Sequence, residues 1–291
     1  MTNPMDRLPL GDYEPFRSWS GHPRSWGAKD SGWRAWFGGK VVDGLCEVLD
    51  EHLAAECDGF PAVIGCVPWL NKEAVVDRLL KMTACCVVLD KGACIIPERL
   101  VNSGVGFPNY ALPQLEDKAA AVNGGPLIVG PYTPQGATEY DLGPVRRLGW
   151  LRGAGKPLLH AKLLVLGQLD TYYLDAPGEY SRYGFVPQSI WFGSANCTDP
   201  SRSHLEVGFV CDDSSLIQDA TDFVANVIAF SEPVGTACVG PEPNLIAFEY
   251  DDDAMVAACE EQYLTHLEEE AQNAQAQSYF EREDEDGDGE H

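Results

Sequence analysis

Two short segments of the sequence combine residue types that bind and transfer phosphate. His160 and Lys162 are separated by one residue within an apolar run. An imidazole and an ammonium are costly to bury without partners, so core packing does not explain them, whereas an anion between them would. The second segment is an apolar run that ends in Gly193-Ser194-Ala195-Asn196, a turn of small residues with hydroxyl and amide donors. Together the two segments offer a nucleophile, a cation and hydrogen-bond donors for a phosphate group.

The order of these residues, followed by Glu206, resembles the phospholipase D-like phosphodiesterase superfamily, also called the HKD family. The resemblance implies that His160 is the nucleophile and that a second His160 is the acid–base group. It implies that Lys162, Ser194 and Asn196 hold the phosphate oxygens and that Glu206 accepts a hydrogen bond from a histidine ring. It implies no metal and no cofactor, because two lysines supply the positive charge.

The sequence departs from the family pattern in three places. Gly167 stands where the His-x-Lys-x4-Asp motif has its Asp, and the segment from Gly167 to Ser189 is longer than in many members. His204 occupies a position where many members carry Asn. The chain also contains a single His-x-Lys, whereas the family's reaction centre contains two such motifs facing each other. The resemblance therefore predicts a two-fold homodimer with the site at its interface.

Cationic residues outside the motifs are candidates for substrate binding. Between residues 142 and 162 there are several Arg and Lys side chains and no acidic one. We expect substrate contacts from five side chains, namely Arg146, Arg152, Arg182, Arg202 and His204. The alternatives are a solvated strand edge for Arg146 and Arg152, ordinary surface charges for Arg182 and Arg202, and a supporting role for His204.

Composition limits the cellular setting and the partners. The 291 residues carry a net charge of −25, which by itself disfavours a nucleic-acid partner, but acids are concentrated after Leu245, where Arg282 is the one Lys or Arg. We find no run of about 20 apolar residues and no apolar leader, which predicts a cytoplasmic protein without stable membrane insertion. The ten cysteines form no C-x-x-C pair, so buried free thiols are expected rather than a zinc site.

The elements that must position the motifs follow from hydrophobic spacing. It predicts helices over 41–55, 71–82 with Asn71 as N-cap, 216–230 and 251–275, and strands over 61–67, 85–89, 145–151, 158–166, 190–192 and 205–211. A strand, helix and strand in succession indicate a parallel pair. We therefore expect an α/β fold, with a mixed, mostly parallel β-sheet flanked by helices on both faces. The expected parts are an irregular aromatic and basic arm (1–32), a phospholipase D-like catalytic domain (33–245), a C-terminal helix (246–276) and an acidic disordered tail (277–291).

Three functions remain open at this point. The first is a metal-independent phosphodiesterase, in particular a nuclease that works through a phosphohistidine at a homodimer interface. The second is a phospholipase or other phosphodiester hydrolase. The third is a non-catalytic binding or scaffold protein that keeps the fold, for which Gly167 in place of Asp is the main argument.

Overall fold

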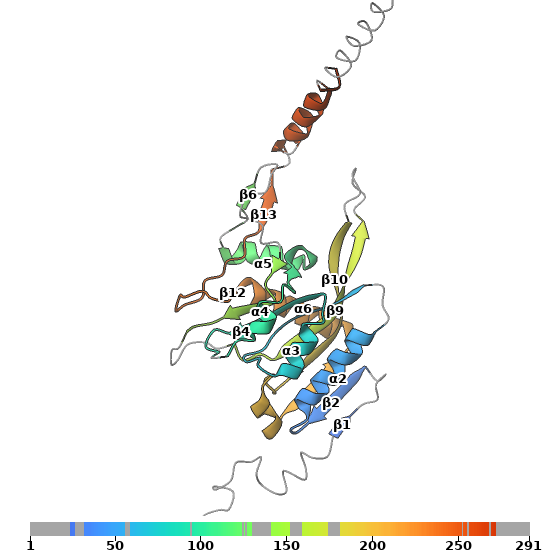
Figure 1. The fold of residues 1–291 in the computed structure, drawn as a ribbon, viewed down its shortest axis with the longest axis vertical. Coiled ribbons are helices and arrows are strands. Elements are labelled where there is room, and N and C mark those ends of the chain that lie inside the picture. The colour runs from blue at the N-terminus through green and yellow to red at the C-terminus, as the bar shows by residue number, and fades with distance from the viewer. Residues whose placement is uncertain are drawn as a thin grey trace, which may run out of the picture. The chain divides into compact units, whose positions relative to one another are not determined.

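The computed structural model describes most of the chain between Arg24 and residue 271 (Figure 1). The described residues are 24–26, 32–55, 59–93, 95–123, 125, 127–129, 141–151, 159–173, 181–251, 253–254, 256–267 and 269–271. The acidic tail expected over 277–291 lies outside this set, as does most of the expected N-terminal arm. Within that arm, residues Arg24–Trp26 form strand β1, which pairs with β2 (Trp33–Phe37), so this short piece is regular rather than irregular.

The main body is built on one sheet of nine strands in the order β1-β2-β11-β10-β9-β3-β4-β8-β12. Its parallel core consists of β3 (Phe60–Cys66), β4 (Ala84–Asp90) and β8 (Val145–Leu148). Antiparallel strands extend the core on both sides: β9 (Leu163–Tyr173), β10 (Ser181–Gly193), β11 (Val207–Cys211) and β2 on one side, and β12 (Glu232–Pro233) on the other. The expected mixed α/β sheet is confirmed. Its parallel pairs, β3–β4 and β4–β8, lie toward the β12 end of the sheet, and its other strand pairs are antiparallel.

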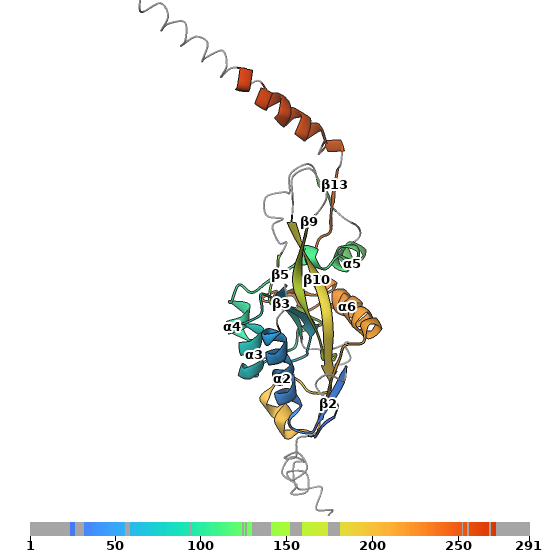
Figure 2. The same cartoon turned by 90° about the vertical axis from the view of Figure 1, so that its right-hand side faces the viewer.

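Helices cover both faces of the sheet, as expected (Figure 2). Helices α2 (Val41–Ala54) and α3 (Glu73–Leu79) bury their apolar sides with Val63, Val87 and Leu164 of the sheet. Helices α5 (Gln114–Asn123) and α6 (Ser214–Ala229) pack against the other face of the sheet, which presents the alternate strand residues, such as Ile64 and Val165. Successive strand residues point to opposite faces, so a sheet covered on both sides requires strands such as β4, which is apolar up to its last residue, Asp90.

Shorter elements complete the main body. They are α4 (Glu98–Val101), β5 (Phe107–Pro108), the 3-10 turn η3 (Asn109–Ala111), β7 (Asp141–Leu142) and the 3-10 turn η4 (Asp199–Ser203). Strands β9 and β10 form a long hairpin, and they take in much of the long segment from Gly167 to Ser189. The hairpin carries the backbone directly to both motif segments.

A second, smaller unit comprises residues 126–138 and 248–291. Its described part includes β6 (Leu127–Val129) paired in parallel with β13 (Phe248–Tyr250). Helical residues follow at 253–254, 256–267 and 269–271. The helix expected over 246–276 is therefore preceded by a strand, and the domain boundaries given above remain expectations. No helix among the described residues is long and apolar enough to cross a membrane.

Candidate active site

The His-x-Lys pair lies immediately before β9 and not inside the strand, contrary to the expectation. Pairing with β10 continues one residue further, because the Gly193 N–H donates to the carbonyl of Lys162 at 3.2 Å. His160 is exposed, whereas Lys162 is 7% exposed and its Nζ donates to the carbonyl oxygen of His160 at 2.9 Å. The two side chains therefore differ in exposure, and the Lys162 ammonium is held against the main chain of His160.

The segment before His160 is anchored by Asp90, a residue that the motif comparison did not single out. Asp90 ends β4 and is 4% exposed. Its Oδ2 accepts a hydrogen bond from the Leu159 N–H at 3.0 Å, and its Oδ1 accepts one from Gly92 at 2.7 Å. A carboxylate at the carboxyl end of a central parallel strand is a sequence signal for a site, because ligands of α/β sheets bind there. Asp90 therefore fixes the backbone one residue away from the candidate nucleophile.

Ser194 and Glu206 form the second half of the site. The Ser194 hydroxyl donates to Glu206 Oε2 at 2.5 Å and accepts from the Val207 N–H at 2.9 Å. The Glu206 side chain is 11% exposed, and its Oε1 lies 3.8 Å from Nδ1 of His204, whose side chain is 64% exposed. Among the described residues no hydrogen bond joins Glu206 to His160, so within one chain the carboxylate orients Ser194 rather than the motif histidine.

Burial sets the electrostatics around Lys162. Burial lowers the pKa of Lys162, and the nearby Glu206 carboxylate opposes that shift. Burial also raises the pKa of the Cys66 and Cys197 thiols to about 12. Both thiols are therefore protonated near neutral pH and do not compete as nucleophiles. Glu206 is left as the anionic neighbour of the lysine.

Asn196 is held beside the loop that follows β3. Leu70 and Cys197 form an isolated parallel bridge, and the N–H groups of Asn71 and Lys72 donate to the Cys197 carbonyl at 3.0 and 2.9 Å. Lys72, not Asn71, is the N-cap residue of α3, and no side-chain hydrogen bond caps the helix. The expected cap is therefore wrong. Instead, Asn71 and Asn196 line one pocket of about 320 Å³.

Gly167 has a structural reason for being glycine. A Cβ at this position in β9 would lie 2.3 Å from the Val186 carbonyl oxygen and 2.8 Å from the ring of Phe185. Real Cβ atoms do not approach backbone so closely, and hence no side chain fits without a shift of the β9–β10 hairpin. The missing Asp thus reflects close packing of two strands.

The expected substrate-binding residues separate into different environments. Arg146 is 3% exposed, and it donates to Ser231 Oγ at 2.6 Å and Asn244 Oδ1 at 2.5 Å. The expectation that it contacts substrate is wrong, because an interior guanidinium with these partners is not free to bind. Of the other four, His204 lies beside Glu206, Arg152 is outside the described residues, and Arg182 in β10 and Arg202 in η4 have side chains that the structure does not describe.

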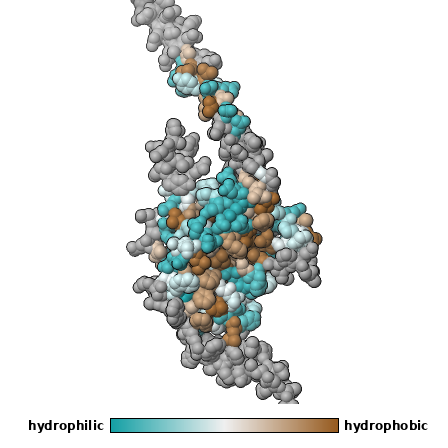
Figure 3. Space-filling model, turned by 180° about the vertical axis from the view of Figure 1, so that it is seen from behind, coloured by the Kyte–Doolittle hydropathy of each residue, from teal (hydrophilic) through white to brown (hydrophobic). Residues whose placement is uncertain are grey.

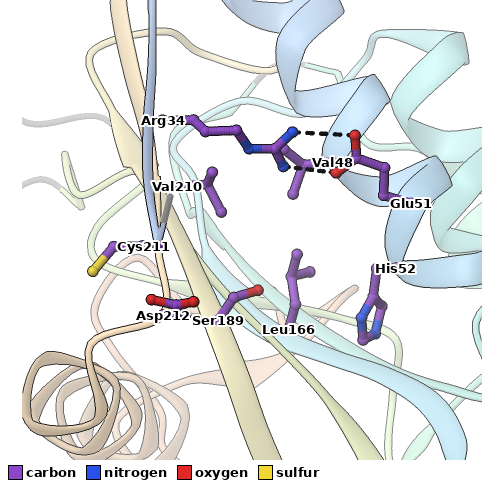
Figure 4. Close-up of a pocket in the computed structure, with 10 residues that line it drawn as sticks. Arg34, Val48, Glu51, His52, Leu166, Ser189, Val210, Cys211 and Asp212 are labelled. Atoms are coloured by element: carbon purple, nitrogen blue, oxygen red, sulfur yellow. Dashed lines mark hydrogen bonds and ion pairs between the residues drawn. The ribbon is translucent and has the colours of Figure 1, made fainter. Parts of the chain in front are cut away.

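A second pocket, of about 230 Å³, lies between α2 and the sheet (Figure 4). In Figure 4 Arg34 and Glu51 face each other across one side, and the guanidinium donates to both carboxylate oxygens at 3.1 and 2.7 Å. None of the motif residues lines this pocket. The described residues contain no group of three or more His, Cys, Asp or Glu side chains placed to hold a metal ion.

Comparisons with known proteins give no match to a family model and none to a curated protein. Solved structures with a similar chain path include NucT from Helicobacter pylori, at a TM-score of 0.38 and 11% identity, covering 72% of this chain and 98% of that one. Nuc from Salmonella typhimurium, a phospholipase D family member, has a TM-score of 0.35 and 11% identity over 66% of this chain and 90% of its own. The archaeal chromatin protein TrmBL2 has a TM-score of 0.34 and 9% identity, and the match covers 72% of this chain and 56% of that one. Likeness at this level assigns no family, substrate or mechanism to the chain.

Proposed function

We propose that the protein is a metal-independent phosphodiesterase that cleaves nucleic acid through a phosphohistidine intermediate. The observation that carries the proposal is the convergence of two motif segments at one edge of the sheet. The segment just before β9 contributes the exposed imidazole of His160 and the buried ammonium of Lys162. The turn after β10 and the residue before β11 contribute a hydroxyl and a carboxylate that are hydrogen-bonded to each other. These are the groups that a two-step transfer of a phosphoryl group needs.

In the first step the imidazole of His160 attacks phosphorus, a P–N bond forms and the P–O bond to the leaving group breaks. The His160 of a second copy protonates the leaving alkoxide. That histidine then takes a proton from water, which attacks phosphorus and releases the first His160. Lys162 and the Asn196 amide bind the non-bridging oxygens, whose charge the buried ammonium stabilises more strongly than an exposed one could.

The hydrogen bonds at Ser194 refine its role. Its hydroxyl proton is directed to Glu206 and its oxygen already accepts from Val207, so in this arrangement it donates nothing to a phosphate. We therefore assign Ser194 to positioning Glu206. The carboxylate in turn lies near Lys162 and His204, where it offsets part of the cost of burying the ammonium.

A single chain supplies one His160, so the proposed site is complete only in a homodimer. An exposed aromatic surface on the β2–β11–β10 part of the sheet is a candidate contact for the second copy. Phe192 and Phe209 stack there with ring centroids 5.4 Å apart, and Trp33 and Phe37 beside them are 38% and 41% exposed. Figure 3, which is seen from behind relative to Figure 1, shows apolar residues gathered on the described surface of that side. Such gathering is typical of surfaces that bind another protein.

The test of the activity is cleavage of plasmid DNA and of a generic aryl phosphodiester in EDTA, with wild type and His160→Ala side by side. We expect wild type to cleave and the variant to lose activity by about 10³-fold or more, because covalent catalysis and proton transfer both need the imidazole. Equal cleavage by both proteins, or cleavage abolished by EDTA, contradicts the mechanism. Hydrolysis of phosphatidylcholine without cleavage of plasmid would instead support a phospholipase.

A subunit-mixing experiment tests whether two copies share one active site. Wild type and His160→Ala are unfolded together in equal amounts and refolded, which randomises the pairs. A shared site predicts about a quarter of the wild-type activity, since only wild-type pairs keep both histidines, whereas independent sites predict about half. A monomeric mass in solution with full turnover contradicts the shared site.

A further inference from the structure

The pocket beside Asn196 has features that the reaction at phosphorus does not use. Its lining includes the indole of Trp69, which is 40% exposed, the side chain of Ile95, which is 58% exposed, and the amides of Asn71 and Asn196. At about 320 Å³ it is at the lower end of the range for small-ligand pockets. His204 lines it as well and lies 3.8 Å from Glu206, so the pocket adjoins the proposed phosphate site.

The amide oxygens of Asn71 and Asn196 are the unsatisfied acceptors at this pocket. Oδ1 of Asn71 and Oδ1 of Asn196 are both buried, and neither has a hydrogen-bond partner among the described residues. Thr198 and Ser201, which also line the pocket, are within hydrogen-bond distance of each other at 3.3 Å. Buried amide oxygens without donors are uncommon in folded proteins, so each is a candidate acceptor for a bound group.

The charge of the lining indicates what kind of group fits. Among the side chains that the structure describes, this lining contains no Lys, Arg, Asp or Glu. The neighbouring Lys72 is paired with Asp199 and is not available for a second phosphate. An uncharged, flat group that carries N–H donors and stacks on indole satisfies the lining, and a nucleobase is such a group. The trimethylammonium of a choline headgroup also binds aromatic faces, but it has no N–H to offer the two amides.

We propose that Trp69 and Asn71 form the subsite for the nucleobase next to the scissile phosphate. This inference rests on the proposed function and names its substrate class. The base stacks on Trp69, and its ring or amino N–H groups donate to the amides. The loop after β3 holds the subsite in register with the catalytic turn, because the Asn71 and Lys72 N–H groups are bonded to Cys197, the residue after Asn196.

The experiment compares ligands that differ only by the base. Dissociation constants are measured calorimetrically for the 2′-deoxynucleoside 5′-monophosphates and for deoxyribose 5-phosphate, none of which is a phosphodiester substrate. We expect Trp69→Ala to weaken nucleotide binding by about 5- to 100-fold, the usual loss for one stacked base, and to leave the sugar phosphate unchanged. Asn71→Ala should reduce the discrimination among the four bases. Phe223→Ala, which removes a 45% exposed ring on α6, is the matched control.

Equal affinity of wild type for nucleotide and sugar phosphate overturns the subsite, even if plasmid cleavage is intact. Tighter binding of choline phosphate than of any nucleotide, lost in Trp69→Ala, overturns it in favour of a lipid headgroup. The midpoint of thermal unfolding is measured for each variant, and a midpoint close to that of wild type shows that a loss of binding is not due to misfolding. Base-dependent binding that Trp69→Ala removes supports the subsite even in a protein that fails to cleave DNA, so the two proposals fail separately.

Discussion

Two polar clusters of similar composition lie in the main body, and they differ in how completely their groups are paired. In the interior cluster Lys91 is fully buried, donates to the Gly240 carbonyl at 2.5 Å and forms an ion pair with Glu232. In the candidate site Lys162 has a main-chain acceptor and a nearby carboxylate, while His160 beside it is exposed. A buried lysine thus belongs to a closed ion pair in one place and lies beside an exposed histidine in the other.

The comparison shows that a cation's role is decided by what surrounds it. Arg146 is close in sequence to the His-x-Lys motif, yet it belongs to the interior cluster through Ser231 and Asn244. Removing Lys91 from the interior cluster leaves the buried Glu232 carboxylate without its cation, whereas removing Lys162 leaves Glu206, which is 11% exposed and keeps its hydrogen bond from Ser194. Substitutions in the two clusters should therefore have opposite consequences for stability and activity.

The largest effect is expected in the interior cluster. Lys91→Met should lower the free energy of unfolding by about 3–5 kcal/mol, because the buried Glu232 carboxylate loses its cation. Urea denaturation measures this. The control is Lys91→Met with Glu232→Met, which removes both charges and should recover much of the loss. A single variant as stable as wild type would mean that the pair contributes nothing.

In the candidate site the effect should fall on activity instead. Lys162→Ala should reduce the rate of phosphodiester cleavage by about 10²- to 10³-fold, the usual cost of losing one group that stabilises transition-state charge. Its unfolding midpoint in urea should remain closer to wild type than that of Lys91→Met. The contrast between the two clusters breaks down if Lys162→Ala destabilises the protein as much as Lys91→Met does, or if it keeps full activity.

A smaller effect is expected at Gly167, where the family motif has Asp. Gly167→Asp should destabilise the protein by about 1–3 kcal/mol, because the new Cβ overlaps the Val186 carbonyl. Gly167→Ala should show a similar loss, which separates crowding from charge. Higher activity and unchanged stability in Gly167→Asp would show that the absent carboxylate, not close packing, distinguishes this position.

The smallest effect concerns pH. Burial lowers the pKa of Lys162 below 10.5, so its proton is lost at lower pH than in the unfolded chain, and the activity that depends on the ammonium should fall before pH 10.5 is reached. Lys162→Arg keeps its charge and should move this decline to higher pH. Rates measured from pH 7 to 11 test the shift. A decline at the same pH in both proteins assigns it to another group.

Much of the fold could be predicted from the sequence. Helix α2 and strands β3 and β4 lie within a few residues of their predicted bounds, because their apolar residues follow one regular period. Of the free thiols expected to be buried, six are confirmed, namely Cys46, Cys66, Cys85, Cys86, Cys197 and Cys211, whereas Cys238 and Cys259 are exposed. Patterns of this kind are local, so a short stretch of sequence is enough to show them.

The site was only partly predictable. The motifs identified Lys162, Ser194 and Glu206, which the structure brings together. The hydrophobic pattern, however, predicted that His160 lies within a strand and that Asn71 is the N-cap of a helix, and both predictions are wrong. Trp69 was not singled out, because a lone tryptophan in a loop has no spacing that marks it. Its pairing with Asn71 and Asn196 depends on the bridge between Leu70 and Cys197, which are far apart in the chain.

The sequence by itself determined the elements and the residue types of the reaction, since both are written in local spacing and in short motifs. The tertiary structure alone decided which polar side chains are enclosed and which are exposed, why position 167 admits no side chain, and which loop borders the catalytic turn. The physical reason is that burial and hydrogen-bond satisfaction depend on atoms contributed by distant segments, such as Ser231 for Arg146 and Val186 for Gly167.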